Sequence, residues 1–165
     1  MIMKRANVWL GAAAIVENDE KKWLVVKKTY GGLEGLWSFP AGFVEANETI
    51  DEGAVREVKE ETGIDAAICE LVAFRTGVLE YSVSDHMAIF LARPKDERQQ
   101  ICLCEKEIAD VAWLSRKELQ ERSDVSEMVK EMSRHLTSAR CELGDAINPG
   151  DQFGYTSYKL FYKKD

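Results

Sequence analysis

The N-terminal part of the chain carries apolar runs that are typical of β-strands. Residues 8–16 form one such run, and after a polar turn at residues 17–20 a second run covers residues 23–27. Short apolar runs bounded by turn residues predict buried strands, and two in succession predict a hairpin. Lys4 and Arg5 before the first run imitate a secretory signal peptide, but the run is short and the next strand continues it. We therefore predict a strand rather than a leader.

A helical pattern replaces the strand pattern at residues 49–63. Thr49 and Glu52 have the spacing of a capping box, and Gly63 stands where a glycine commonly ends a helix. At about 100° per residue, Ile50, Ala54, Val55 and Val58 fall on one apolar stripe. The pattern predicts a helix that packs this stripe against the sheet.

Further strands and two more helices are predicted beyond residue 65. Residues 66–79 and 86–92 read as long β segments joined by a polar turn at 80–85, and short β segments follow at 101–103 and 110–114. Ser115 is the expected N-cap of a helix at 116–121, and Ser123 or Asp124 starts another that runs to about Leu136.

The last part of the chain differs in composition, with several glycines and a proline before the aromatic stretch at 155–162. We expect one α/β domain over residues 1–138 and a C-terminal tail over residues 139–165. The tail is interpreted as an added strand, a lid over the site or a surface for homodimer formation.

Composition and charge limit the kinds of partner. The 165 residues are 45% hydrophobic, as in a globular domain, and the net charge is −7. This balance argues against duplex DNA, which is bound by clustered Lys and Arg. A small phosphorylated substrate is compatible with it, because a bound divalent cation reverses the local field. No run reaches the ~20 apolar residues of a membrane span.

The cysteines indicate the compartment. Cys69, Cys102, Cys104 and Cys141 form no C-x-x-C pair, and the two histidines do not lie at zinc-ligand spacing. We interpret them as reduced, partly buried thiols, which predicts a cytoplasmic protein.

The predicted helix at 49–63 places charge beside its own apolar stripe. Glu57, Glu60 and Glu61 stand at i, i+3 and i+4 and share one face, which overlaps the edge of the stripe. Mutual repulsion and partial burial raise carboxylate pKa values, and a hard cation such as Mg²⁺ removes the conflict. The alternative is a solvated face in which Arg56 and Lys59 form local ion pairs.

The surrounding residues favour the metal. Residues 42–64 match the pattern G-x5-E-x7-R-E-U-x-E-E-x-G-U, where U is aliphatic, at Gly42, Glu48, Arg56, Glu57, Val58, Glu60, Glu61, Gly63 and Ile64. This stretch resembles the Nudix box, and residues 37–42 resemble the usual entry into it. The resemblance covers residues 7 to 138 and implies an α/β/α sandwich with a mixed β-sheet.

The resemblance also implies an activity, the hydrolysis of a nucleoside diphosphate linked to another moiety with Mg²⁺ or Mn²⁺ as cofactor. By position, the metal ligands are Glu57, Glu60, Glu61 and the carbonyl of Ala41, and Arg56 and Glu48 form a supporting ion pair. The general base varies within the family. Here the candidates are Glu61, Glu105, Glu107 and, further away, Glu80, and the last three are equally consistent with solvated loop charges.

Substrate contacts are expected from strand ends. Lys27, Lys28 and Arg75 are candidates to pair with phosphates, while Tyr30 and Trp37 are candidates to stack on a base, although Trp37 also suits a core position. Tyr81 lies 17 residues after Ile64, as in members that cleave diadenosine polyphosphates.

The expected function is Mg²⁺-dependent pyrophosphohydrolysis of a small nucleotide, such as a nucleoside triphosphate, dinucleoside polyphosphate or nucleotide sugar. A nucleotide-sensing module without catalysis and an RNA 5′-end pyrophosphohydrolase are the alternatives.

Overall fold

The computed structural model describes residues 7–103, 105–136, 141–143 and 145–163. Its strands are β1 (Val8–Val16), β2 (Lys22–Lys28), β3 (Trp37–Ser38), β4 (Ala41–Phe43), β5 (Ala66–Leu79), β6 (Val83–Pro94), β7 (Ile108–Ser115), β8 (Cys141–Leu143) and β9 (Tyr155–Lys163). The helices are α1 (Ile50–Thr62), α2 (Arg116–Glu121) and α3 (Glu127–His135), and two 3₁₀ turns are η1 (Gly31–Leu33) and η2 (Asp151–Phe153).

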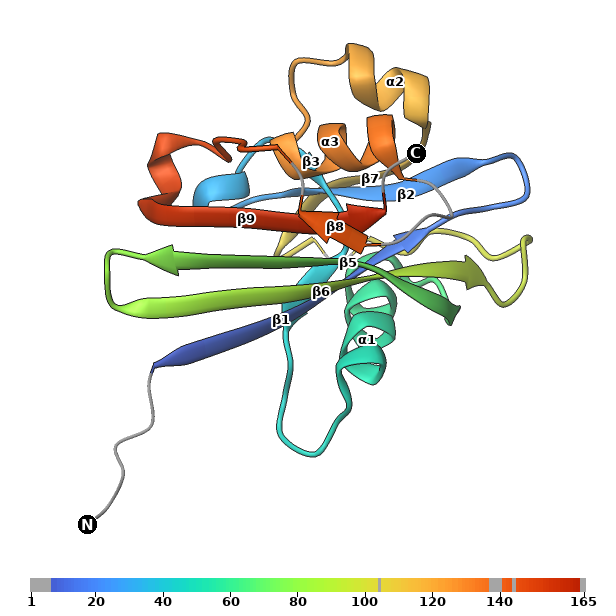
Figure 1. Ribbon diagram of the computed structural model, residues 1–165. Helices are drawn as coiled ribbons and strands as arrows, with labels where there is room; N and C mark the ends of the chain where they lie inside the picture. The colour runs from blue at the N-terminus through green and yellow to red at the C-terminus, as the bar shows by residue number, and fades with distance from the viewer. Residues whose placement is uncertain (1–6, 104, 137–140, 144, 164–165) are drawn as a thin grey trace.

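The strands form a larger sheet in the order β4-β1-β6-β5-β9-β8 and a smaller one in the order β3-β2-β7. β1 and β6 run parallel, whereas their neighbours pair antiparallel, so the larger sheet is mixed. Helix α1 lies on one side of the strands and α2 and α3 lie on the other (Figure 1). The expected α/β/α sandwich with a mixed sheet is confirmed.

β1 is buried on both faces along most of its length, which explains its continuous apolar run. Ala12 and Ala14 belong to the core that α1 covers, whereas Ala13 and Ile15 belong to the core under α2 and α3. Small side chains on the first face let the helix approach the sheet closely. The acidic face of α1 is therefore held at a fixed height above β1 and β4.

Helix α1 has the predicted limits. The backbone N–H of Thr49 donates to the Glu52 carboxylate at 2.7 Å, and Gly63 ends the helix in the left-handed region at φ 76°. Ala54 and Val58 are fully buried. The sequence signals for the start and the end of this helix are confirmed. The packed face is confirmed at Ile50, Ala54 and Val58, whereas Val55 is only partly buried.

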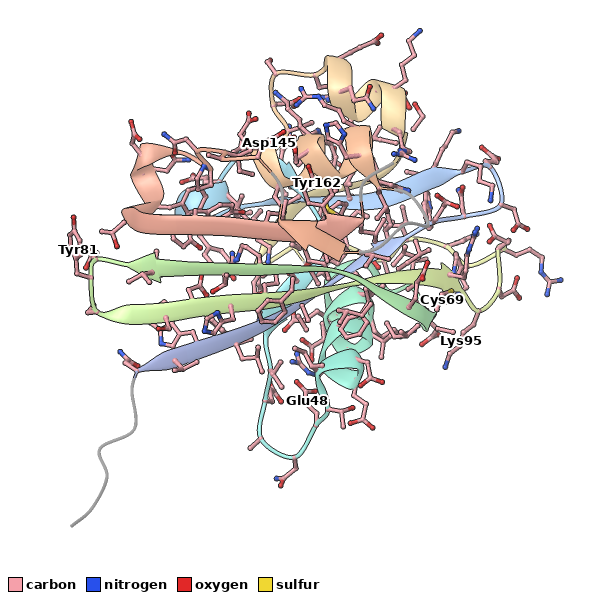
Figure 2. All side chains as sticks on the ribbon, in the orientation of Figure 1. Glu48, Cys69, Tyr81, Lys95, Asp145 and Tyr162 are labelled. Carbon is pink, nitrogen blue, oxygen red and sulfur yellow. The ribbon has the colours of Figure 1, made fainter. Side chains whose placement is uncertain are left out.

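The tail contributes to the larger sheet. β9 pairs antiparallel with β5, and Leu160 and Tyr162 are buried in the core under α2 and α3. The Tyr162 hydroxyl, labelled in Figure 2, donates a hydrogen bond to the Glu131 carboxylate of α3. The added strand is thus tied to both a neighbouring strand and a helix.

The predicted start of the last helix is wrong. The second of the C-terminal helices is capped by Ser126, whose side chain accepts from the N–H of Val129, rather than by Ser123 or Asp124. Asp124 instead binds Arg122 and Lys27 through its carboxylate, so it is not free to cap a helix.

Residues 101–103 do not form the predicted strand. Their backbone instead runs past the end of α1, where the N–H of Cys102 donates to the carbonyl of Thr62 at 2.8 Å. The turn after β5 is also tighter than predicted: Glu80 and Tyr81 have φ values of 46° and 56°, and β6 begins at Val83.

The two cysteines with described side chains, Cys69 and Cys102, are free and exposed, so the expectation of partly buried thiols is wrong for them; Cys104 and the Cys141 side chain lie outside the described residues. Among the described helices, none has the length and apolar character needed to cross a bilayer.

Candidate active site

The three carboxylates of the acidic face have different environments. Glu57 and Glu61 lie one turn apart and are 9% and 2% exposed, whereas the Glu60 side chain is 57% exposed. The Glu57 carboxylate lies directly against the backbone of Gly42 in β4, where any β-carbon would overlap it. Glycine at this position therefore makes room for a buried acid between α1 and the sheet.

Arg56 organises the outer part of the site. Its Nε and Nη2 donate to the two oxygens of Glu48 at 2.9 and 2.8 Å, and Nη1 donates to Glu57 at 2.8 Å and to Glu60 at 3.1 Å. The hydrogen bonds from Arg56 to Glu48 lower the pKa of Glu48 to about 2. Nη2 also donates to the carbonyl of Phe43, which connects α1 to the end of β4. One guanidinium thus fixes three carboxylates and the strand beside them.

Lys28, the last residue of β2, organises the inner part. Its ammonium donates to the Ala41 carbonyl and to Glu61 Oε1, both at 2.8 Å. Burial raises the pKa of Glu61 to about 7, although Lys28 acts in the opposite direction. Burial also raises the pKa of Glu57, against the effect of Arg56. Keeping Glu57 and Glu61 ionised in this site therefore costs free energy.

The donor set suits a hard divalent cation. Ala41 and Glu61 share one partner, Glu57 lies against the residue after Ala41, and the buried Glu61 Oε2 has no hydrogen-bond partner among the described residues. Carbonyl and carboxylate oxygens are the ligands that Mg²⁺ and Mn²⁺ prefer. In the described part of the chain no three acidic, His or Cys side chains yet converge on one point. Arg56 binds Glu57 and Glu60, whereas Lys28 binds Glu61.

A cleft with a volume of about 390 Å³ opens beside this donor set. Lys28, Ala41 and Gly42 line the end nearest α1. Trp9 of β1 and Phe43 of β4 also line it, and their rings meet edge to face at 5.6 Å between centroids. Both rings are exposed, so a planar apolar group can reach them from solvent.

The C-terminal tail lines the same cleft through Gln152, Phe153 and Tyr155. The Phe153 ring packs on Gly32, where a β-carbon would overlap it, and Gln152 Nε2 donates to the Gly32 carbonyl at 3.3 Å. The tail is therefore fitted to the loop between β2 and β3 and closes one side of the cleft.

A polar group lines the cleft between these walls. Arg75 of β5 donates to the Asp85 carboxylate of β6 at 2.6 Å, and the Tyr155 hydroxyl donates to the same oxygen. The Arg75 guanidinium also lies 5.9 Å from the centre of the Tyr155 ring. The Arg75 and Asp85 side chains are both largely buried, so this ion pair has little freedom to move. It presents a fixed arrangement of charges to a ligand.

The other predicted substrate residues lie elsewhere. Lys27 points away from Lys28, because successive strand residues face opposite sides, and binds Asp124 at 2.9 Å. Tyr30 is 52% exposed, and Tyr81 is 88% exposed at the tip of the β5–β6 hairpin (Figure 2). Trp37 is only 4% exposed, in agreement with its interpretation as a core residue.

The predicted loop bases are exposed. Glu105 and Glu107 lie in the turn before β7, where the Glu107 carbonyl accepts from the N–H of Thr29, so this turn borders the end of β2. Glu80 lies in the hairpin turn. Glu61 is the predicted base that lies inside the site.

Sequence reasoning missed Trp9, Phe43 and Asp85 as residues of the cleft. No motif marks them, because strand pairing and not spacing in the chain brings them together. Phe153 and Tyr155 lie in the tail, which was predicted only as an added strand, a lid over the site or a dimer surface.

Residues 9–136 match the model of the NUDIX domain. The chain is 34% identical over 131 residues to "Phosphatase NudJ" of Escherichia coli, covering 77% of this chain and 82% of that protein. It is 37% identical over 117 residues to "Nudix hydrolase 8" of Arabidopsis thaliana, covering 69% of this chain and 31% of that protein. The chain spans between 20% and 52% of the length of several eukaryotic relatives.

A solved structure supports the fold independently. A NUDIX hydrolase from Nitrosomonas europaea is 30% identical, covers 74% of this chain and 65% of its own, and superposes with a TM-score of 0.60. The matched family region ends before η2 and β9, which contribute Gln152, Phe153 and Tyr155 to the cleft.

Proposed function

Because the chain belongs to the Nudix hydrolase family, we propose that it hydrolyses a phosphoanhydride bond of a small nucleotide with Mg²⁺ or Mn²⁺ as cofactor. Nucleoside triphosphates, dinucleoside polyphosphates and nucleotide sugars are the candidate substrates. The reaction would take place where the cleft meets α1.

One observation carries this proposal: two buried carboxylates lie beside a strand carbonyl, at the end of the cleft that Lys28, Ala41 and Gly42 line. Glu57 and Glu61 are nearly inaccessible, and their ionisation is costly without a cation. An arrangement that only solvated the helix would leave all three acids exposed, as Glu60 is. The burial of two of them favours metal binding over the solvated alternative.

The residues that would hold the ion are Glu57, Glu61 and the Ala41 carbonyl, with Glu60 at the exposed side. When bound, the ion supplies Lewis-acid chemistry that neutralises the phosphate oxygens. Arg56 keeps Glu57 and Glu60 in position through charge-assisted hydrogen bonds, a supporting role that orients ligands.

Proton transfer is assigned to Glu61. Of the candidate bases it is the one that lies inside the site, and its Oε2 has no hydrogen-bond partner among the described residues. Glu105 and Glu107 are the alternatives, since their turn borders the end of β2. A variant in which both are changed to Gln would retain turnover if Glu61 is the base.

The cleft would bind the rest of the substrate. Trp9, Phe43 and Phe153 offer aromatic surface for a base, and Arg75 lies on the wall between them with a charge suited to a phosphate. We also propose that the tail belongs to the catalytic unit, since it supplies one wall. A homodimer built on the tail stays a prediction that light scattering tests.

The free surface thiols Cys69 and Cys102 are compatible with a reducing compartment, and the proposed location is the cytoplasm.

The proposal is tested by measuring product formation from a panel of substrates with and without Mg²⁺ or Mn²⁺. The panel contains nucleoside triphosphates, ADP-ribose, diadenosine polyphosphates, nucleotide sugars and 5′-triphosphate RNA, and products are separated by ion-exchange chromatography. The wild type is compared with Glu57→Gln, which keeps the shape of a buried ligand and removes its charge. Asp51→Asn is the matched control, because it removes an exposed charge from the same helix.

Metal-dependent turnover that is lost in Glu57→Gln and kept in Asp51→Asn would support the proposal and rank the substrates. Nucleotide binding without any product would favour the sensing module instead. Turnover of RNA in preference to every small nucleotide would move the substrate assignment to RNA 5′ ends.

A further inference from the structure

The ammonium group of Lys28 lies between two oxygens that belong to the proposed cation site. It donates to the Ala41 carbonyl and to Glu61 Oε1, each at 2.8 Å. The Lys28 and Glu61 side chains are only 12% and 3% exposed. This is therefore a buried, doubly anchored cation and not a solvated strand-end lysine.

A lysine in this place meets an electrostatic need. The charge of Glu61 is nearly excluded from water, and its second oxygen, Oε2, is buried without a hydrogen-bond partner among the described residues. A buried carboxylate stays ionised only when a positive group neutralises it. In this arrangement that group is the ammonium, which also satisfies the Ala41 carbonyl.

We propose that the Lys28 ammonium and the divalent cation occupy the same position in turn, so that metal binding displaces Lys28 into the cleft. This inference rests on the cation site of the proposed function. Both cations need the same two oxygens, and at Mg²⁺–oxygen distances of about 2.1 Å the ion would lie against the ammonium. Two positive groups in contact repel, so one must leave.

The structure gives Lys28 room to move. Its side chain lines the cleft, and the pairing of β2 with β7 shifts register between Lys27 and Lys28. The flexible four-carbon side chain lets the ammonium turn from Glu61 toward the open cleft while the backbone stays in place. There it joins Arg75 on the cleft lining, where a phosphate oxygen is the partner of suitable charge.

Lys28 would therefore have two roles. It keeps the ligand oxygens neutralised and close together before the ion arrives, and it becomes a phosphate-positioning residue afterwards. Binding of the ion and exposure of the phosphate-binding group are then one event.

The direct test measures the accessibility of the lysine amines by brief acetylation followed by peptide mass spectrometry, without and with saturating Mg²⁺. The acetylation rate of Lys28 should rise several-fold with Mg²⁺. Lys27 is an internal control on the neighbouring position, since it binds Asp124 on the other side of the strand and its rate should not change. Calorimetry on the same sample records whether Mg²⁺ binds.

Each outcome decides between the two proposals. If calorimetry shows binding and the Lys28 rate is unchanged or falls, the exchange is wrong while the cation site stands. If no ion binds, both proposals fail. If the rate rises only at Lys28, the exchange is supported.

A second measurement uses the affinity for Mn²⁺ alone at about pH 8.5. Lys28→Met should bind Mn²⁺ about tenfold more tightly than wild type, the size expected when a charge-assisted hydrogen bond no longer has to be broken. Lys27→Met should bind with wild-type affinity. Equal or weaker binding by Lys28→Met would overturn the exchange.

Discussion

Replacing Glu61 with Gln should stabilise the metal-free protein in alkali and have little effect in acid. Burial raises the pKa of Glu61 from 4.5 to about 7, so between these values the folded state holds a proton that the unfolded state has lost. The stability of the folded state therefore falls as pH rises through this window, and the full cost is present above about pH 7. Gln resembles the protonated acid and avoids the cost.

The magnitude follows from the size of the shift. The difference between about 7 and 4.5 is roughly 2.5 units, which corresponds to about 3 kcal/mol. The attraction of Lys28 is already contained in this value, because Lys28 lowers the pKa. For a chain of this size each kcal/mol moves the melting temperature by about 2–4 °C, so the expected gain is roughly 6–12 °C.

The assay is denaturant unfolding with a chelator present, at about pH 5 and about pH 8, of wild type, Glu61→Gln and Glu60→Gln. The stability gap between wild type and Glu61→Gln should widen toward pH 8. Glu60→Gln should not widen it, because the Glu60 side chain is mostly in water. A gap of constant size at both pH values would refute the argument that burial makes the Glu61 charge costly.

Three further changes test other parts of the structure. A lysine at position 56 cannot reach Glu48, Glu57 and Glu60 together, so Arg56→Lys should lower Mn²⁺ affinity and turnover about 10- to 100-fold each. Calorimetry measures the affinity and a product assay measures the turnover. Wild-type values would contradict the supporting role of Arg56. Gly32→Ala should push Phe153 off the loop and raise KM for a nucleotide several-fold with kcat largely kept, and an unchanged KM would show that the tail wall does not contact substrate. Leu160→Ala should cost about 2–5 kcal/mol of unfolding free energy in urea, whereas a loss below 1 kcal/mol would mean that β9 is only loosely attached.

Local signals made α1 and β1 predictable. In the capping box, at the terminal Gly63 and along the apolar stripe, each interacting pair of residues is at most four positions apart. The sequence alone therefore contains the interactions that form the helix. β1 was predictable because a strand covered on both faces needs apolar residues throughout.

Features that depend on distant pairing were not predictable. Residues 101–103 have strand-like composition, but the N–H of Cys102 pairs with the end of α1 instead of a strand. The hairpin turn lacks the Asn-Gly signal of a tight turn, although Glu80 and Tyr81 adopt its positive φ values.

The same distinction holds for the site. The glutamates of α1 follow from helical spacing, but the sequence could not show that two are buried and one is exposed, because this depends on how the helix lies on β4. Lys27 and Lys28 look equivalent in the sequence. Because successive side chains of a strand point to opposite faces, only Lys28 points toward Glu61.

The pairing of β9 with β5 also affects the order in which the chain can complete its fold during synthesis. β5 lies near the middle of the sequence, and its outer edge is covered by residues that are made about eighty positions later. Until residues 155–163 emerge from the ribosome, this edge presents unpaired N–H and C=O groups beside the exposed side chains of Leu71 and Phe74. The nascent protein therefore passes through a stage in which helix α1 is already complete while the sheet beneath the cleft can still pair with another chain.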